Sequence, residues 1–514
     1  MLSNVKSMAL DGLEGDLIEI QTEVSNGIPK FEVVGLPDTS IKEAKERVRI
    51  AIKNLNIDIP SRKILINLAP ADRRKEGTVF DLPIAIGILT AIGIIKKEKF
   101  EDFDRTIFLG ELSLDGKINR VKGVLPMCIE ASNLGIKKVI LPKANAREAA
   151  VVKELEIIPV SSLQEVIDFI NGEINIKRLN VDINKILKNK GKYVVDFSEV
   201  KGQENVKRAL EIATAGFHNC ALIGSLGSGK SMLAQRIPTI LPDITFKEAL
   251  EITKIHSIAG NIKSGDSIVK SRPFRNPHYT TSTISIIGGG RIPKPGEISL
   301  AHLGVLYLDE LPEFNSNALE ALREPLEDKI VTISRLNSTL TYPCNFMLIA
   351  SMNPCKCGYY GTDESKCTCS EQSINKYLSK VSGPLLDRID LHIEVKPVKY
   401  KNLDSHEKGE TSKQIKERVD RARNIQLNRY KDFNIYTNGE LSHNLIERFC
   451  VIDENGKQLL KKAFNNLGLS ARAYDKILKI SRTIADLDGE ENIMPNHIAE
   501  AIQYRSLDRK YWKK

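Results

Sequence analysis

A glycine-rich loop between an apolar run and a helix-forming segment constrains this chain more than any other feature. The loop is Gly224-Ser-Leu-Gly-Ser-Gly-Lys-Ser231, and it follows the apolar residues 221–223. Glycines allow successive backbone N–H groups to turn towards one anion, and the dipole of the following helix points its positive end at the same place. The sequence therefore predicts a nucleoside triphosphate site. Its predicted contacts are Gly224, Gly227, Ser228, Gly229, Lys230 for the outer phosphates and Ser231 for Mg²⁺.

Two acidic residues follow a second apolar run further along the chain. The run 304–308 ends in Asp309-Glu310. One carboxylate in such a position holds Mg²⁺, directly or through water, and the next polarises the water that attacks the γ-phosphate. An acidic pair after a strand is weak evidence alone, but it is strong downstream of a complete phosphate loop. We therefore predict that Asp309 binds the metal and that Glu310 is catalytic.

Length and shifts in composition predict an α/β protein of about three domains. An N-terminal α/β domain spans residues 1–172, and residues 173–195, rich in Ile, Asn and Lys, form a basic linker. The phosphate loop lies in a second α/β domain at 196–400, and a helical domain follows at 401–514. In the first domain, strands are expected at 17–24 and 63–68 and a mostly buried helix at 81–94.

Composition excludes a disordered or membrane-spanning chain. Hydrophobic residues make up 41% and charged residues 27%, as in ordinary globular proteins. The net charge of +9 is compatible with a polyanionic partner without demonstrating one. No apolar run reaches transmembrane length and no signal segment opens the chain, so we expect a cytoplasmic protein without membrane contact. Eight cysteines in such a chain favour metal ligands or free thiols over disulfides.

Three segments together carry a resemblance to a known family. Residues 200–219 (Val-Lys-Gly-Gln-Glu-Asn-Val-Lys-Arg-Ala-Leu-Glu-Ile-Ala-Thr-Ala-Gly-Phe-His-Asn), the phosphate loop and residues 296–302 (Gly-Glu-Ile-Ser-Leu-Ala-His) resemble the magnesium-chelatase-like AAA+ ATPases of the ComM/YifB type. The resemblance covers essentially the whole chain and implies that the nucleotide is ATP, with Mg²⁺. One departure lies in the loop, where the family usually has two prolines and this chain has Ser225 and Leu226.

The resemblance also implies roles for three residues outside the loop. Asn353 follows the apolar strand 346–350 and matches the polar residue that senses the γ-phosphate. Arg388 matches an arginine that reaches the nucleotide of a neighbouring subunit, although a surface pair with Asp387 or Asp390 is the alternative. Arg472 matches a second sensor, from the helical lid. An arginine supplied to a neighbour requires a homo-oligomer, and the family implies a hexameric ring.

Two N-terminal segments, residues 67–77 and 109–116, resemble the Lon-protease-type domain. A Lon-type peptidase needs a nucleophilic serine and a lysine that activates it. The matched positions hold Val79 and Leu125, which supply neither group. A shifted dyad would have to use Thr78 and Lys122. We therefore predict a Lon-like domain without peptidase activity.

Four cysteines in two close pairs are candidate zinc ligands. They are Cys355, Cys357, Cys367 and Cys369. Thiolates favour Zn²⁺ in tetrahedral sites, and the intervening glycines allow the pairs to come together. The C-x-C spacing is less typical than C-x-x-C, so reduced free thiols or a redox pair are the alternative. A zinc ion here would have a structural role.

Basic, glycine-containing stretches suggest what the motor acts on. Residues 271–300 include Arg272, Arg275 and Arg291, and residues 331–342 form a second, hairpin-like stretch. Such loops can hold nucleic-acid phosphates without regard to sequence. With the family resemblance, this predicts a ring motor on single-stranded or branched DNA, with helicase or branch-migration activity in recombination and natural transformation. The alternative is a chelatase- or chaperone-type ATPase that remodels a protein partner.

Overall fold

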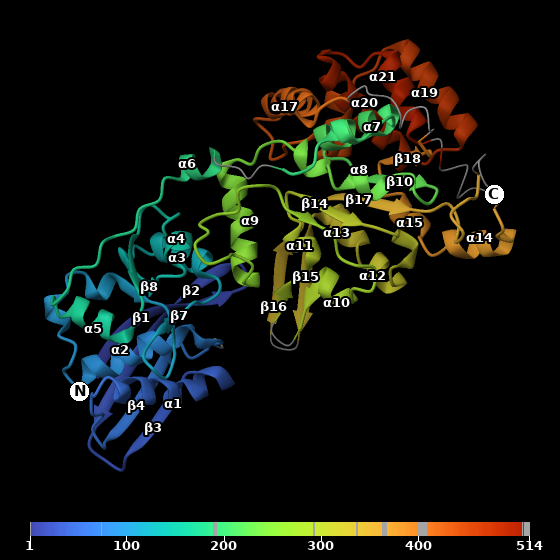
Figure 1. The fold of residues 1–514 in the computed structure, drawn as a ribbon. Coiled ribbons are helices and arrows are strands. Elements are labelled where there is room, and N and C mark those ends of the chain that lie inside the picture. Colours follow the sequence, from blue (N-terminus) through green and yellow to red (C-terminus); the bar gives the residue numbers. More distant parts are fainter. Residues whose placement is uncertain are drawn as a thin grey trace. The chain divides into compact units, whose positions relative to one another are not determined.

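The computed structural model describes residues 2–72, 75–188, 193–290, 293–335, 338–361, 367–398, 409–505 and 507. The chain forms two compact units (Figure 1). The N-terminal unit consists of residues 1–190 and 246–270, and the C-terminal unit of residues 191–245 and 271–514. Within the described residues, no helix is both long and apolar enough to cross a membrane.

The N-terminal unit is built on a seven-stranded sheet with the order β3-β4-β2-β1-β5-β8-β9. Strands β1, β2 and β4 pair antiparallel, and the other pairs in the sheet are parallel. The strands are β1 (Leu2–Asp11), β2 (Glu14–Ser25), β3 (Lys30–Val34), β4 (Lys63–Ala69), β5 (Thr106–Phe108), β8 (Lys138–Pro142) and β9 (Glu156–Val160). A small hairpin joins β6 (Glu111–Leu112) to β7 (Ile118–Asn119).

The helices of this unit are α1 (Thr39–Asn54), α2 (Asp81–Ala91), α3 (Val124–Asn133), α4 (Ala146–Ala149), α5 (Leu163–Ile170), α6 (Ile183–Lys188) and α9 (Phe246–Ala259). The strands expected at 17–24 and 63–68 lie in β2 and β4, where alternate residues are buried because successive side chains point to opposite faces. Helix α2 is buried on nearly every side, so the prediction of an internal apolar helix is confirmed.

Helix α9 belongs to the N-terminal unit, although its sequence lies inside the region predicted as the ATPase domain. The backbone N–H of Gly123 donates to the carbonyl of Ser257 at 3.1 Å, and the Ser257 hydroxyl donates to Glu148. Glu148 is buried and also accepts the N–H of Leu125 at 3.2 Å. A buried carboxylate requires such donors, which explains why α9 is held here. The chain consequently passes between the two units three times.

The C-terminal unit contains a five-stranded, fully parallel sheet with the order β11-β14-β17-β10-β18. The strands are β10 (Cys220–Gly224), β11 (Phe274–Arg275), β14 (Val305–Leu308), β17 (Met347–Met352) and β18 (Leu391–Val395). The central strands are fully buried, as expected for a parallel sheet covered on both faces. Helices beside the sheet include α7 (Glu204–Gly216), α8 (Lys230–Ala234), α13 (Arg323–Asp328), α14 (Glu371–Leu378) and α15 (Gly383–Leu386).

Two short hairpins interrupt the α/β core. Strands β15 (Ile330–Arg335) and β16 (Ser338–Pro343) pair antiparallel, so the hairpin predicted at 331–342 is confirmed. Strands β12 (Gly288–Gly289) and β13 (Lys294–Pro295) form the second, smaller hairpin.

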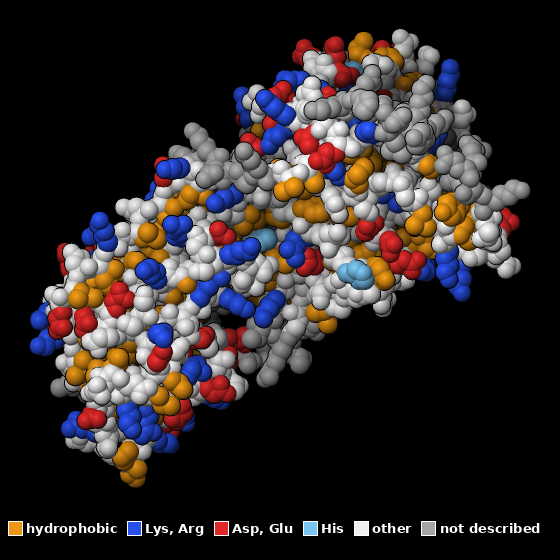
Figure 2. Space-filling view, in the orientation of Figure 1, with side chains coloured by type: hydrophobic (Ala, Val, Ile, Leu, Met, Phe, Trp, Pro, Cys, Tyr) orange, Lys and Arg blue, Asp and Glu red, His pale blue; other side chains and the backbone are white. Residues whose placement is uncertain are grey.

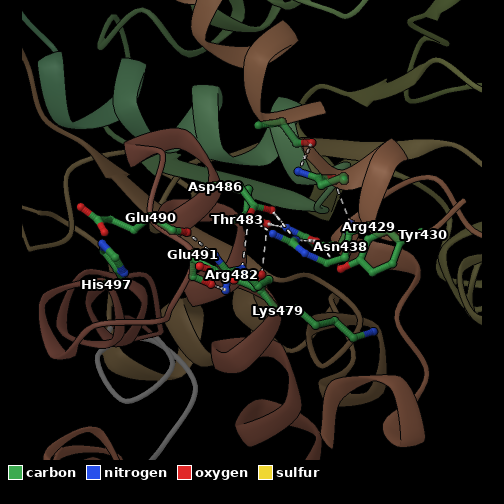
Figure 3. A network of polar contacts seen from close by, with 12 residues as sticks. Arg429, Tyr430, Asn438, Lys479, Arg482, Thr483, Asp486, Glu490, Glu491 and His497 are labelled. Carbon is green, nitrogen blue, oxygen red and sulfur yellow. Dashed lines mark hydrogen bonds and ion pairs between the residues drawn. The ribbon is translucent and has the colours of Figure 1, made fainter. Parts of the chain in front are cut away.

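The last part of the chain is helical and is tied together by buried polar contacts. Its helices are α17 (Ser412–Arg429), α18 (His443–Phe449), α19 (Glu454–Leu467), α20 (Ala471–Asp488) and α21 (Pro495–Gln503). Figure 3 shows Asp486 at the centre of the contacts, where it accepts from Arg429 at 2.9 Å, Asn438 at 2.8 Å and Arg482 at 3.1 Å. His218, which follows α7, joins this network through the Thr483 hydroxyl at 2.7 Å. The helical region is therefore anchored to the sheet.

Candidate nucleotide site

Strand order brings the predicted ATP-site residues to one edge of the sheet. Strand β17 lies between β10 and β14, and all three run in the same direction. In register, Ile223 lies opposite Met352, and Leu308 lies opposite Ala350. The carboxyl ends of the three strands therefore meet, and they deliver the phosphate loop, Asp309 and Asn353 to the same place.

The phosphate loop has the backbone that its glycines predict. Gly227 and Gly229 have φ values of +74° and +88°, in the left-handed region that favours glycine. A Cβ on Gly224 would lie 2.2 Å from the carbonyl oxygen of Val395, so no other residue fits beside β18. The Ser228 hydroxyl closes the loop by donating to the Ser225 carbonyl at 2.9 Å.

Lys230 lies inside this loop and reaches Asn353, the predicted sensor. Its Nζ donates to the carbonyls of Gly224 and Ser225, each at 2.8 Å, and to Asn353 Oδ1 at 3.0 Å. Burial lowers the pKa of Lys230 to about 8, although the charges of Asp309 and Glu310 oppose this shift. The loop, the lysine and Asn353 thus form one connected group.

Ser231 and Asp309 form the candidate Mg²⁺ site. The Ser231 hydroxyl donates to Asp309 Oδ2 at 2.8 Å. Both groups offer the oxygen ligands that Mg²⁺ requires, so they would hold the ion, whose charge would be supplied to the phosphate oxygens. Sequence analysis missed two further residues: Ser351 donates to Asp309 Oδ1, and Tyr307 Oη lies 3.1 Å from Ser351 Oγ. Their only signal was a polar group within an apolar strand.

Glu310 begins a turn immediately after the buried strand β14. Its φ of +55° is left-handed, which is uncommon for a residue with a side chain. The turn leaves Glu310 exposed, next to the partly buried Asp309. Glu310 N donates to Asp309 Oδ1 at 3.1 Å. The two carboxylates thus leave the strand in different environments, as different roles require.

Arg388 lies at the amino-terminal ends of the strands, whereas the phosphate loop lies at their carboxyl ends. Arg388 precedes β18, whose first residue Leu391 is in parallel register with Cys220, the first residue of β10. The Asn219 side chain also donates to the Arg388 carbonyl at 3.0 Å. A five-residue strand is about 16 Å long, so Arg388 lies about that distance from the phosphate loop of its own chain.

Arg388 and Arg472 share one carboxylate. Glu327 on α13 lies 2.7 Å from Arg388 Nη2 through Oε2, and 3.5 Å from Arg472 Nη2 through Oε1. Arg388 also donates to the carbonyls of Arg323 and Pro384 and is only 11% exposed, whereas Arg472 is 61% exposed. The structure therefore places Arg472 beside Arg388. The structure pairs Arg388 with Glu327 rather than with Asp387 or Asp390, so the alternative of an ion pair within the chain holds with a different carboxylate.

The four cysteines converge as a metal site requires. All four Sγ atoms lie within 4.8 Å of one another. Cys355 Sγ lies 3.3 Å from Cys357 Sγ and 3.7 Å from Cys367 Sγ. A tetrahedral zinc site with Zn–S bonds of about 2.3 Å has sulfurs about 3.8 Å apart. Cys355, Cys357, Cys367 and Cys369 could therefore hold Zn²⁺.

The N-terminal unit shows no peptidase dyad among the residues that the structure describes. Val79 and Leu125 are both buried. The Thr78 hydroxyl donates to Glu111, and the Lys122 side chain packs over Gly260. Thr78 and Lys122, the alternative dyad, therefore have other contacts and do not form a pair with each other.

Two arginines of the basic stretch are used inside the fold. Arg275 forms a two-bond pair with Glu297, at 2.6 and 2.7 Å. Arg272 donates to the carbonyls of Pro242 and Leu303, each at 2.9 Å. Both side chains are therefore held by contacts within the chain. Arg291 lies outside the described residues.

Comparisons with known proteins agree with this architecture. Residues 196–403 match the family described as magnesium chelatase, subunit ChlI; residues 20–145 match subunit ChlI of Mg-chelatase; and residues 409–505 match the C-terminal region of subunit ChlI. The chain also resembles Lon protease 2 of Bacillus subtilis, with 30% identity over 193 residues, or 33% of each chain.

Two relatives match along the whole chain. The competence protein ComM of Haemophilus influenzae is 43% identical over 510 residues, which cover 99% of this chain and 98% of that protein. The YifB protein of Escherichia coli is 41% identical over 512 residues, with the same coverage. The chain therefore belongs to the ComM/YifB family of magnesium-chelatase-like AAA+ proteins, with an N-terminal ChlI/Lon-like domain, a central AAA+ ATPase domain and a C-terminal helical domain.

Proposed function

We propose that this protein is an ATP-hydrolysing ring motor that acts on single-stranded or branched DNA. The observation that carries the proposal is the position of Arg388 and Arg472. Both arginines are joined to Glu327, and Arg388 lies a strand length from the phosphate loop of its own chain. We infer that Arg388 serves the site of a neighbouring subunit, and that Arg472, which shares Glu327 with it, serves the same site.

Within one subunit, five residues prepare ATP for hydrolysis. Lys230 binds the outer phosphates, and Ser231 and Asp309 hold Mg²⁺. Glu310 accepts a proton from the attacking water and orients it towards the γ-phosphate. Asn353 contacts Lys230 and senses whether the γ-phosphate is present.

The neighbouring subunit completes the reaction. Arg388 and Arg472 stabilise the charge that develops on the transferred phosphoryl group, a contribution that reaches about 10³- to 10⁵-fold for arginines of this kind. Hydrolysis therefore requires a homo-oligomer. We propose a hexameric ring, in which each subunit both binds ATP and serves the next site.

DNA as the substrate is supported by the name of the Haemophilus influenzae relative, a competence protein. On the face drawn in Figure 2, basic side chains are interspersed with acidic ones, so the net positive charge is not gathered into one field there. We therefore place the DNA contacts on the two hairpins, where Lys294 and the threonine pair Thr332 and Thr341 offer exposed polar groups. We propose that the ring uses ATP hydrolysis for helicase or branch-migration activity on this DNA, in recombination and natural transformation.

The deciding experiment measures the ATPase rate with and without a four-way DNA junction, at low and at physiological salt. We expect stimulation that is strongest at low salt, because phosphate contacts weaken as salt rises. Glu310→Gln protein controls for a contaminating ATPase. A rate that ignores DNA at low salt would contradict the proposal.

A protein substrate is the second candidate, and the three chelatase family matches favour it. In that case the same ring would remodel a partner protein. A DNA-independent ATPase that is stimulated by a purified protein partner would support this second function.

A further inference from the structure

Two of the four cysteines, Cys355 and Cys357, lie between Asn353 and Gly358, the two residues that contact the phosphate-loop region. Cys355 comes two residues after Asn353, whose Oδ1 accepts the Lys230 ammonium at 3.0 Å. Gly358 comes one residue after Cys357 and packs on Leu226 at the tip of the phosphate loop. The cluster is thus connected to the ATP site at two points.

The contact between Gly358 and Leu226 is close. A Cβ built on Gly358 would lie 3.0 Å from Leu226 Cδ1 and 3.5 Å from the Leu226 backbone nitrogen. Gly358 has a φ of +86°, which lets the chain turn directly after Cys357, and its N–H donates to the Cys355 carbonyl at 3.0 Å. Leu226 is 60% exposed, so this contact covers a side chain that is otherwise largely in solvent.

A third contact extends from the segment that follows the cysteines. Tyr377 on α14 is mostly buried, and its hydroxyl lies near the backbone of Asn353. Burial, with the nearby charges of Glu313 and Glu310, raises the pKa of Tyr377, so this hydroxyl stays protonated. The chain on both sides of the cluster therefore contacts the end of β17.

We propose that metal binding by Cys355, Cys357, Cys367 and Cys369 controls the affinity of the phosphate loop for ATP. With Zn²⁺ bound, the segment that carries Cys355, Cys357 and Gly358 is folded, so that it contacts Leu226 and holds Asn353 in place. Without it, no metal ion joins the four thiols, and the segment 355–361, which contains Gly358 and Gly361, loses its fold, as small metal sites do. Ser225 and Leu226 lack the ring that fixes φ in proline, so the phosphate loop then loses its preorganisation for phosphate.

This inference rests on the proposed ATP site. The test compares metal-loaded protein, protein stripped with a zinc-selective chelator and then freed of chelator, and stripped protein to which Zn²⁺ has been returned. Zinc is counted by elemental analysis. The affinity for a fluorescent, non-hydrolysable ATP analogue is measured by anisotropy with excess Mg²⁺.

We expect one zinc per chain in the loaded protein and an affinity at least about fivefold weaker after stripping, the lower end of usual coupling between sites. Returning Zn²⁺ should restore the affinity. By linkage, the ATP analogue should raise the affinity for zinc by the same factor. Equal ATP affinity in the loaded and stripped protein, or a loaded protein without metal, would overturn the inference.

Substitutions distinguish the effect of zinc binding from the effect of the contact between Leu226 and Gly358. Cys367→Ser should lose zinc and weaken ATP binding, whereas Cys128→Ala, at a buried cysteine of the N-terminal unit, should change neither. Leu226→Ala should keep zinc and weaken ATP binding, and unchanged binding would exclude this route. A loaded protein that binds no ATP at all would instead contradict the proposed function.

Discussion

Asp390 and Lys476 form an ion pair of 2.8 Å between the start of β18 and helix α20. Each side chain is only 15% exposed. Asp390 lies two residues after Arg388, and Lys476 lies four residues, about one helical turn, after Arg472. The pair therefore adds a second link, besides Glu327, between the segments that carry the two arginines.

Asp390→Asn should destabilise the protein and impair hydrolysis without impairing ATP binding. Removing one partner of a buried ion pair leaves an uncompensated charge, at a cost of about 3 kcal/mol. The phosphate loop lies at the carboxyl ends of the strands, whereas Asp390 lies at the amino end of β18. The affinity for ATP should therefore be retained while kcat falls. Urea unfolding, nucleotide binding and steady-state kinetics measure the three quantities. Asp387→Asn is the matched control and should leave all three near wild type.

Mixed oligomers should show that both arginines act on a neighbour's nucleotide. Arg388→Ala and Lys230→Ala proteins should each be inactive alone, because one lacks the donated arginine and the other lacks the phosphate contact. In a mixture, an intact phosphate loop meets an intact arginine at some interfaces, so ATPase activity should return. Arg472→Ala mixed with Lys230→Ala should behave in the same way. A mixture that stays inactive would show that Arg472 serves its own subunit.

Glu310→Gln should separate ATP binding from hydrolysis. The amide keeps the size of the side chain but cannot accept the proton of the attacking water, and losing a general base typically costs about 10²- to 10⁴-fold in rate. ATP affinity should stay close to wild type, because Lys230, Ser231 and Asp309 remain. Single-turnover hydrolysis and equilibrium binding test this. Glu313→Gln, three residues later, is the control, and equal losses in both variants would argue against a specific role for Glu310.

ATP affinity should depend on pH through Lys230. Burial lowers the pKa of Lys230 to about 8, so the free protein carries a protonated lysine below that pH. Above pH 8 the neutral amine must first take up a proton to bind phosphate as an ammonium, and affinity should fall by up to about tenfold per pH unit. Binding measured from pH 6.5 to 9.5 at constant ionic strength gives the profile. Lys230→Arg stays protonated throughout and should lose this pH dependence, even where its absolute affinity is lower.

Several site residues could be predicted from short stretches of sequence. The glycine spacing from Gly224 to Ser231 predicts the backbone of a phosphate-binding loop. The carboxylate pair after an apolar strand predicts one residue that binds Mg²⁺ and one that orients the attacking water. The C-x-C pairs indicate a metal site because thiols are otherwise seldom gathered. Ser351 and Glu327 gave no comparable signal, since a lone serine in a strand and a glutamate on a short helix are ordinary.

The sequence by itself determined the local chemistry of this protein: a phosphate loop, an acidic strand end, four clustered thiols and the helices and strands that carry them. These features depend on backbone conformation and on side chains a few residues apart. Only the tertiary structure decided that α9 packs with the N-terminal unit, that Arg472 lies beside Arg388, and that Gly358 touches Leu226. Each of these depends on which faces of distant segments pack together, and that choice is made by the burial of apolar surface and the pairing of buried charges across the whole fold.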